Sequence, residues 1–358
     1  MEIIGGGRLE VHITAADVGK RVSVRCLSGG GTAGGKFTDT VGVLTSWDNG
    51  VLYITRKSGD GVRIVESTLV AGKVVPPAPA RRRGPAASFA ELARVCARGW
   101  QPVEHERLGA WELRAASGFT RRANSVLPLG DPGMPLDDAL GRVRDWYAAR
   151  ELPAYVQAAT GAEGTQELLC AELERRGWTR EVSVEVRVGG LAAVGDLDSP
   201  AAGLVRLSRS VDAGWLRRYQ RFGVGGVPEA VVTKVLESGP SVWFASVPGE
   251  SGEAGVPGEA GKAGKAGEAP VAIGRCVVDG RWAGFMAVEV APGRRREGLA
   301  TAVMTALAQR ALEEGASAAW LQVESDNTGA LGLYEGMGFA AHHRYHHYRA
   351  PVDAPPVS

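Results

Sequence analysis

An arginine- and glycine-rich segment in the last third of the chain has the chemistry of an anion cradle. Residues 290–300 read VAPGRRREGLA and lie between an expected strand, 285–290, and an expected apolar-periodic helix, 299–314. Gly298 and the small Ala300 let successive backbone N–H groups approach a phosphate, and a helix start adds partial positive charge. The three arginines supply guanidinium groups that suit a pyrophosphate. Such a loop alone is weak support, because many helix starts contain glycine and arginine without binding a ligand.

A second set of residues follows downstream. An expected strand, 320–324 (WLQVE), precedes Asn327 and then an expected short helix that carries Tyr334, before a Gly-Phe pair at 338–339. The first block reads V-x-P-x-x-R-R-x-G-L-A, and the second reads L-x-V-x-x-x-N-x-x-A-x-x-L-Y-E-x-x-G-F. In sequence and spacing, the pair resembles the two acetyl-coenzyme A motifs of the GNAT superfamily of N-acetyltransferases, over residues 205–349.

The resemblance implies roles for the matching residues. Backbone amides of the loop would hold the pyrophosphate of acetyl-coenzyme A, and the strand edge 288–290 would pair with the pantetheine arm. The N–H of Val288 or Glu289 would polarise the thioester carbonyl. Asn327 would bond to the arm, and Tyr334 would protonate the departing thiolate, unless Tyr334 is simply an aromatic of the core. The expected cofactor-binding residues are Val288, Glu289, Val290, Arg295, Arg296, Glu297, Gly298, Leu299, Ala300 and Asn327.

The general base is less clear from the sequence. An amine with a pKa of about 10 is mostly protonated at neutral pH, so its attack on a thioester needs a base or a water chain. Several N-terminal acetyltransferases of the superfamily place Glu where this chain has Gln322, which cannot accept a proton. Glu324, on the same strand face, and Glu289, at the mouth of the cofactor groove, are both candidates. Each could equally be an ordinary surface carboxylate.

Other groupings predict neither metal chemistry nor a covalent intermediate. Four of the six histidines crowd into residues 342–347, but strand alternation leaves at most two on each face, so no metal site is expected. The four cysteines are far apart and lie outside the motifs. Direct acetyl transfer in a ternary complex is therefore expected, without an acetyl-enzyme.

The pattern of elements predicts an α/β protein, of the mixed-sheet GNAT fold, with four parts. Residues 1–74 contain short strands, expected at 8–13, 21–26, 40–47, 51–56 and 62–65, that are typical of a small SH3-like β-barrel. Residues 75–88 form a Pro/Arg linker, and 89–198 alternate strands and helices. Residues 199–350 repeat that order, with a Gly-X-Y insertion at 249–269 that is expected to be a disordered loop.

The region 89–198 is expected to be a degenerate GNAT-like lobe. Its loop, LPLGDPGMP at 127–135, contains three prolines without amide donors and Asp131, which would repel phosphate. With the segment GFTRRANSV at 118–126 and the N-terminal module (residues 1–74), it resembles actinobacterial two-lobed GNAT proteins with an SH3-like module. Members have been labelled protein or histone acetyltransferases. Mycothiol synthase shares the two-lobed plan, so a small-molecule acceptor is the alternative.

Composition narrows the classes of function and partner. Lys and Arg number 41 against 40 for Asp and Glu, so no overall field attracts nucleic acid or an anionic membrane. With no signal sequence and no apolar run of about 18 residues, a cytoplasmic location is expected. The expected partners are acetyl-coenzyme A, an amine acceptor and a protein at the SH3-like module. A rival interpretation is an acyl-coenzyme A-responsive binding module without catalysis, whereas nucleic-acid binding is not favoured.

Overall fold

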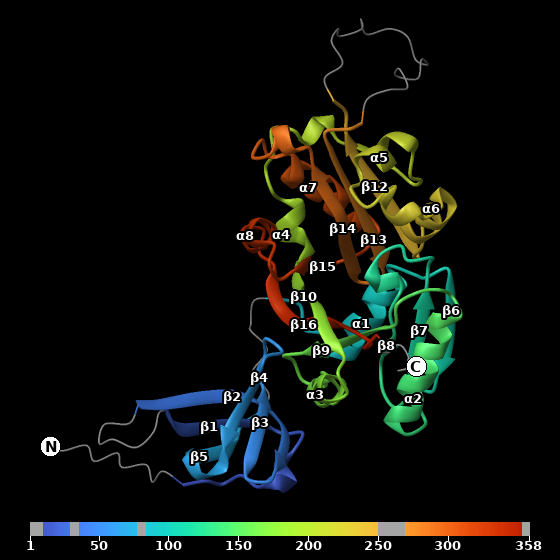
Figure 1. Cartoon of the computed structure of the whole chain (residues 1–358). Helices are drawn as coiled ribbons and strands as arrows, with labels where there is room; N and C mark the ends of the chain where they lie inside the picture. Colours follow the sequence, from blue (N-terminus) through green and yellow to red (C-terminus); the bar gives the residue numbers. More distant parts are fainter. Residues whose placement is uncertain (1–9, 29–35, 77–83, 250–268, 353–358) are drawn as a thin grey trace, which may run out of the picture. The chain divides into compact units, whose positions relative to one another are not determined.

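The computed structural model describes residues 10–28, 36–76, 84–249 and 269–352, which fall into two compact units. Unit 1 contains residues 1–81, 157–183 and 342–358, and unit 2 contains residues 82–156 and 184–341 (Figure 1). Most of the Gly-X-Y insertion and half of the Pro/Arg linker lie outside the described residues. Within the described ranges, none of the helices has the length and apolar character needed to cross a membrane.

The N-terminal part of unit 1 is a five-stranded antiparallel sheet in the order β4-β3-β2-β1-β5. A tight turn joins β2 to β3, with Asn49 and Gly50 both at positive φ, the conformation that Asn-Gly steps favour in hairpins. In the described part of the chain, the edge strands β4 and β5 do not pair with each other. The sheet is therefore open there and does not form a closed barrel. The strands are β1 (Arg21–Ser28), β2 (Lys36–Asp48), β3 (Val51–Thr55), β4 (Gly61–Val65) and β5 (Leu69–Val74).

One expected strand was wrong, and one strand was missed. The segment expected at 8–13 contributes a single bridge in its described part, from Val11 to Gly72, and β5 takes the place beside β1. The glycine inside β5 hides the strand in the sequence, because glycine in a strand interior is unusual. It is needed there because a Cβ on Gly72 would lie 2.8 Å from the side chain of Ile13.

The rest of unit 1 includes helix α3 (Glu167–Arg175) and parts of three strands in the order β10-β16-β9. The strands are β9 (Tyr155–Thr160), β10 (Thr179–Gly190) and β16 (Ala340–Arg349). The β16 imidazole of His346 lies 3.0 Å from the Thr160 hydroxyl and 2.8 Å from that of Ser183. Burial lowers the pKa of His346 to about 4 and that of His343 to about 3, so both are neutral at physiological pH. The described residues contain no group of three potential metal ligands.

Unit 2 begins with a helix and a small sheet in the order β6-β7-β8. Ser88 caps the first helix by accepting a hydrogen bond from Glu91 N. Pro135 lies at the N-cap of the second helix, where its missing N–H costs no helical hydrogen bond. The elements are α1 (Phe89–Arg98), β6 (Glu104–Leu108), β7 (Trp111–Ala115), η3 (Arg121–Ala123), β8 (Leu127–Pro128) and α2 (Leu136–Ala148).

The main sheet of unit 2 has the order β11-β12-β13-β14-β15-β10, of which β10 contributes the part from residue 184 onward. Only β14 and β15 are parallel among the pairs in this order. The strands are β11 (Arg206–Ser208), β12 (Ser241–Val247), β13 (Ala272–Asp279), β14 (Trp282–Val290) and β15 (Ala318–Glu324). The helices are α4 (Leu191–Gly195), α5 (Ala213–Arg218), α6 (Glu229–Leu236), α7 (Leu299–Glu313) and α8 (Thr328–Gly336).

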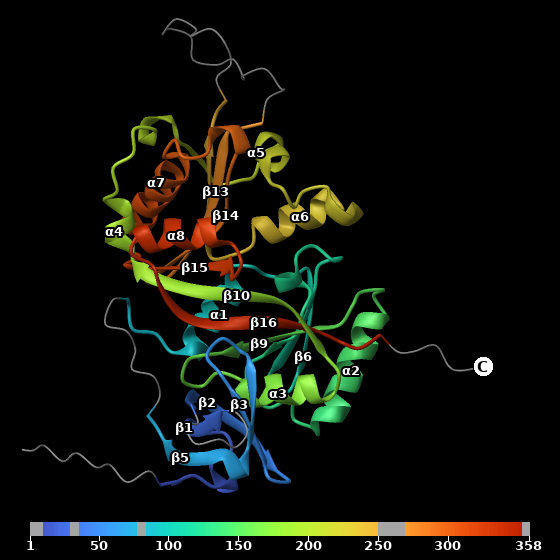
Figure 2. The ribbon, with the colours of Figure 1, turned by 60° about the vertical axis from the view of Figure 1, so that its left-hand side comes forward.

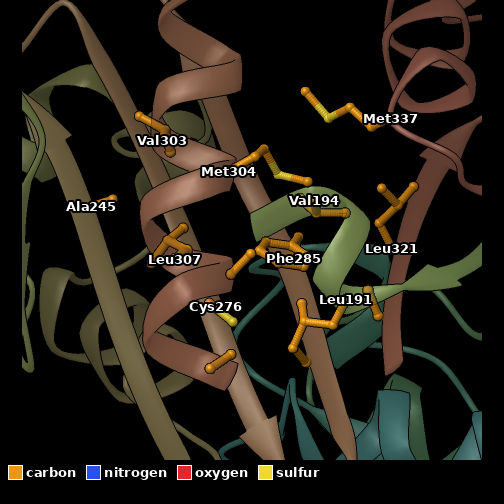
Figure 3. Close-up of a cluster of buried hydrophobic side chains, with 14 of the residues drawn as sticks. Leu191, Val194, Ala245, Cys276, Phe285, Val303, Met304, Leu307, Leu321 and Met337 are labelled. Atoms are coloured by element: carbon orange, nitrogen blue, oxygen red, sulfur yellow. The ribbon is translucent and has the colours of Figure 1, made fainter. Parts of the chain in front are cut away.

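Helices cover both faces of this sheet. On one face, α7 packs against β12, β13 and β14, with α4 beside it (Figures 1 and 2). Side chains from both helices meet sheet residues there, among them Met304, Leu191 and Phe285 (Figure 3). The opposite face carries α1, α5 and α6 in a second core that is rich in aromatic residues, including Trp100, Trp215 and Trp320. Residues 320, 322 and 324 of β15 share this second face, since strand side chains alternate.

A fully buried arginine joins three segments on the second face. Arg275 of β13 donates hydrogen bonds to the carbonyls of Gly99, Leu236 and Ser238, at the ends of α1 and α6. Its guanidinium also lies 5.2 Å from the ring of Trp100. Burial lowers the pKa of Arg275 to about 9, which still leaves it protonated at neutral pH. The negative ends of two helix dipoles compensate the charge in place of a carboxylate.

Replacing this guanidinium should destabilise unit 2 strongly. In Arg275→Met, three buried carbonyls lose their donor, so the free energy of unfolding should fall by about 2–5 kcal/mol. The matched control is Arg206→Met on β11, whose exposed side chain makes no ion pair or hydrogen bond with described residues, and which should stay within about 0.5 kcal/mol of wild type. Denaturant unfolding followed by circular dichroism makes the comparison. Equal stability of the two variants would contradict this role.

Candidate active site between strands β14 and β15

The two parallel strands at the centre of the sheet separate part of the way along. Pairing between β14 and β15 runs from Trp282 opposite Ala318 to Phe285 opposite Leu321. It stops there, although β14 continues to Val290 and β15 to Glu324. The backbone polar groups that face the opening are therefore without a strand partner, and such edges are ready-made templates for an added extended chain.

A bulge increases the separation. Met286 pairs with Arg275 and Glu289 with Ile273, so Ala287 and Val288 together oppose Gly274. Ala287 has φ 51°, a left-handed conformation that is rare for a residue with a side chain. Gly274 is required on the neighbouring strand, because a Cβ there would lie 2.4 Å from Val303 of α7. The bulge was not predicted from the sequence, since Ala287 stands in an unbroken apolar strand pattern.

The loop after β14 forms a start of helix α7 that no side chain caps. Arg296 and Gly298 have φ of 66° and 75°, so left-handed residues alternate with others just before the helix. Such alternation turns successive N–H groups toward a common point. Ser199 fixes the loop by donating a hydrogen bond to Gly298 O (3.2 Å). The first helical bond is from Ala302 N, which leaves the amides of residues 299–301 directed at a potential anion.

The charged side chains of this loop differ in whether they are free to contact an anion. Arg294 pairs with Glu297 at 2.8 Å, which occupies the carboxylate and keeps it from acting as a free negative charge. Arg295 and Arg296 are exposed and have no ion pair with described residues. The structure therefore presents two free guanidinium groups beside the uncapped helix start, and Glu297 can contribute there only by its backbone.

The downstream motif residues lie on and before α8. Asn327 caps this helix by accepting a hydrogen bond from Ala330 N (3.1 Å), so its side-chain NH₂ is left for another acceptor. Tyr334 is half-buried and packs edge-on against Phe339, with ring centroids 6.1 Å apart. Its hydroxyl makes no hydrogen bond to a described residue, and burial raises the pKa of the phenol to about 12. Tyr334 therefore stays protonated at neutral pH and can donate its proton.

The two candidate bases differ in environment. Glu289 is half-buried, and burial raises its pKa, although a 3.0 Å hydrogen bond from Gln220 N acts in the opposite direction. Glu324 is exposed and forms a 3.2 Å ion pair with Arg221. A raised pKa makes a carboxylate a better proton acceptor, and this property distinguishes Glu289 from the exposed, ion-paired Glu324.

Gln322 has a partner that the sequence analysis did not anticipate. Nη1 of Arg122, in η3, donates a hydrogen bond to Gln322 Oε1 at 2.5 Å. Gln322 is the first β15 residue beyond the last pair with β14, so Arg122 reaches the point where the strands separate. The only signal in the sequence is that Arg122 belongs to the segment GFTRRANSV, which carries part of the two-lobed resemblance.

Comparisons with known proteins agree with this geometry. A family described as "Probable histone acetyltransferase Rv0428c C-terminal" matches residues 87–348. The chain is similar to "Probable histone acetyltransferase Rv0428c" of Mycobacterium tuberculosis, with 27% identity over 332 residues, or 91% of this chain and 93% of that protein. It is also similar to the streptothricin acetyltransferase of Streptomyces lavendulae, with 39% identity over 84 residues, or 20% of this chain and 43% of that protein.

A solved structure supports the fold. The GCN5-related N-acetyltransferase from Kribbella flavida matches with a TM-score of 0.51 and 16% identity, over 75% of this chain and 98% of that one. The family match spans both the small sheet and the main sheet of unit 2, including the separated strands and the loop before α7. The chain therefore belongs to the family of the Rv0428c C-terminal region and is an acetyltransferase with the GNAT fold.

Proposed function

We propose that the protein transfers the acetyl group of acetyl-coenzyme A directly to a primary amine. The observation that carries this proposal is the separation of β14 from β15 beside the uncapped start of α7. A pantetheine arm would add to the open edge at Val288 to Val290, and the pyrophosphate would lie at the amides of residues 295–300, with Arg295 and Arg296 as counter-charges.

Two side chains, Glu289 and Tyr334, accept and donate the protons in the proposed step. The protonated amine loses one proton to Glu289 and then attacks the thioester carbonyl, whose oxygen accepts a hydrogen bond from the N–H of Val288 or Glu289. The carbon–sulfur bond then breaks, and the thiolate takes the proton of Tyr334. The nitrogen loses its second proton as the amide forms, and this proton restores the Tyr334 phenol. Asn327 would orient the arm by its free amide N–H groups. No metal enters this scheme.

The acceptor is a protein lysine, a protein N-terminal amine or a small-molecule amine in this proposal. One relative is named as a histone acetyltransferase and another as acting on streptothricin, so the names support both acceptor classes. An alternative is a binding module that senses acyl-coenzyme A without turnover. Retained cofactor binding without acetylation of any amine in a broad screen of amines and proteins would favour that alternative.

The remaining parts of the chain have supporting roles in the proposal. Residues 89–198 would be a degenerate lobe of a tandem GNAT protein that does not bind coenzyme A. Its loop at 127–135 is closed on itself by a hydrogen bond from Gly133 N to the Asp131 carboxylate (2.6 Å). The N-terminal module would be SH3-like and hold a protein partner, for which the exposed Leu27, Phe37 and Tyr53 of its sheet offer apolar contacts.

The loop before α7 can be tested with two glycine variants on one helix. Gly298→Glu places a carboxylate where the pyrophosphate would bind, so acetyl-coenzyme A affinity should fall at least about 100-fold. Gly315→Glu, at the other end of α7, imposes a comparable left-handed strain at φ 89° in open space and should keep wild-type affinity. Calorimetry measures both, and equal affinity for the two variants would remove the loop from the cofactor site.

The phenol of Tyr334 can be tested without disturbing its packing. Tyr334→Phe keeps the ring against Phe339 and removes only the proton donor. Turnover should fall by about 10²- to 10⁴-fold while coenzyme A affinity and melting temperature change little. Steady-state release of free thiol provides the measurement. Wild-type turnover in this variant would show that Tyr334 is a packing residue.

The two candidate bases can be separated by amide variants. Glu289→Gln should lower kcat by about 10²- to 10⁴-fold, whereas Glu324→Gln should retain most activity. Glu289 can act as a base only when it is ionised, and burial raises its pKa. Wild-type activity should therefore fall on acidification with a midpoint above the ordinary pKa of a glutamate side chain. A larger loss of kcat in Glu324→Gln than in Glu289→Gln would exclude Glu289 as the base. So would a pH profile whose activity falls only at the usual pKa of an exposed glutamate.

A further inference from the structure

A strained loop in the first part of unit 2 holds Arg122 at the candidate site. We call residues 116–126 the Arg122 loop. Asn124, which is 5% exposed, uses its whole side-chain amide inside the loop. Its Oδ1 accepts hydrogen bonds from Ala116 N (2.8 Å) and Gly118 N (2.9 Å), and its Nδ2 donates to the carbonyls of Phe119 and Thr120, both at 2.8 Å. A fully bonded buried amide fixes one conformation.

The fixed conformation is an unfavourable one for the backbone. Ser117 and Thr120 have φ of 48° and 58°, in the left-handed region that residues with side chains avoid. Further contacts hold them there, because Trp100 Nε1 donates to the Thr120 hydroxyl (3.0 Å) and buried Arg114 donates to Ser125. Backbone strain that the surroundings enforce is typical of functional sites.

The guanidinium that this loop presents is only partly used. Arg122 is half-buried, lies 4.6 Å above the ring of Trp100 and donates from Nη1 to Gln322. It has no ion pair, and its remaining N–H groups have no partner among the described residues. A partly desolvated guanidinium held over an aromatic ring offers its free N–H groups to an oxyanion.

Aromatic contacts connect the Arg122 loop to the proposed base. Phe119 of the loop packs edge-on against Tyr219, with centroids 6.3 Å apart, and Gln220, the next residue, donates its N–H to Glu289. Tyr219 is 4% exposed, yet its hydroxyl has no hydrogen-bond partner among the described residues. Buried phenols normally have a partner, so this hydroxyl is a second group that a ligand can satisfy.

We propose that Arg122, supplied by the first lobe (residues 89–198), binds a carboxylate of the acceptor while the amine of the same acceptor lies at Glu289. This inference rests on the proposed function and gives it a substrate class, namely amines that also carry a carboxylate. The first lobe then contributes to acceptor recognition although its own loop at 127–135 is not expected to bind coenzyme A. Tyr219 would donate a hydrogen bond to the same carboxylate.

Paired acceptors that differ only in the carboxylate test this proposal. The probes are L-phenylalanine with phenethylamine, γ-aminobutyrate with butylamine, and L-lysine with cadaverine, together with a basic lysine peptide amidated at its C-terminus. The proteins are wild type, Arg122→Met and the control Arg121→Met, which removes the exposed neighbouring arginine. Thiol release gives kcat/KM, and calorimetry gives binding of each probe to protein saturated with coenzyme A.

In at least one pair, wild type should prefer the carboxylate-bearing member by about 10- to 100-fold in kcat/KM and in affinity. Arg122→Met should abolish this preference, whereas Arg121→Met should retain it. If Arg122 had only a structural role, Arg122→Met would lower kcat/KM equally for both acceptors of a pair. The proposal would be overturned if wild type preferred the carboxylate-free amines or the basic peptide, or if its preference for the carboxylate survived in Arg122→Met.

Binding and turnover separate this inference from the proposed function. Carboxylate-dependent binding without turnover would contradict the proposed function alone. Absence of carboxylate-dependent binding in every pair would overturn this inference.

Discussion

The separation of two parallel strands is the constraint on which the candidate site depends. β14 and β15 share a register only as far as Phe285 and Leu321, and β14 has its bulge at Ala287, just beyond that point. Unpaired backbone groups are costly unless water or a ligand bonds to them. The open strand edge and the uncapped helix start follow one another along the chain, between the end of the β14–β15 pairing and residue 299.

A buried charge organises the other face of the sheet. Arg275 gathers the ends of α1 and α6 onto β13 and lies against Trp100, which in turn supports both Thr120 and Arg122. The segment 99–122 is therefore connected to the main sheet of unit 2 by hydrogen bonds and ring contacts and not by chain connectivity alone.

The sequence predicted what depends on local patterns and missed what depends on packing across the chain. The strand, loop and helix around Gly298 follow from glycine, arginine and apolar periodicity, and the structure has them close to the expected bounds. The bulge at Ala287 depends on the approach of α7 to Gly274, which no local pattern announces. Arg122 and Gln322 are 200 positions apart, so one sequence cannot pair them. Strand β5 was hidden for the same reason, because its glycine accommodates Ile13.

The central claim is that the open edge of β14 and the start of α7 together bind acetyl-coenzyme A. Amide hydrogen exchange with and without acetyl-coenzyme A tests it most directly, because the claim concerns backbone N–H groups. Exchange should slow in segments 286–301 and 324–337 and stay unchanged in the first-lobe loop at 127–135. Protection confined to 127–135, or none in 286–301 at saturating acetyl-coenzyme A, would contradict the account.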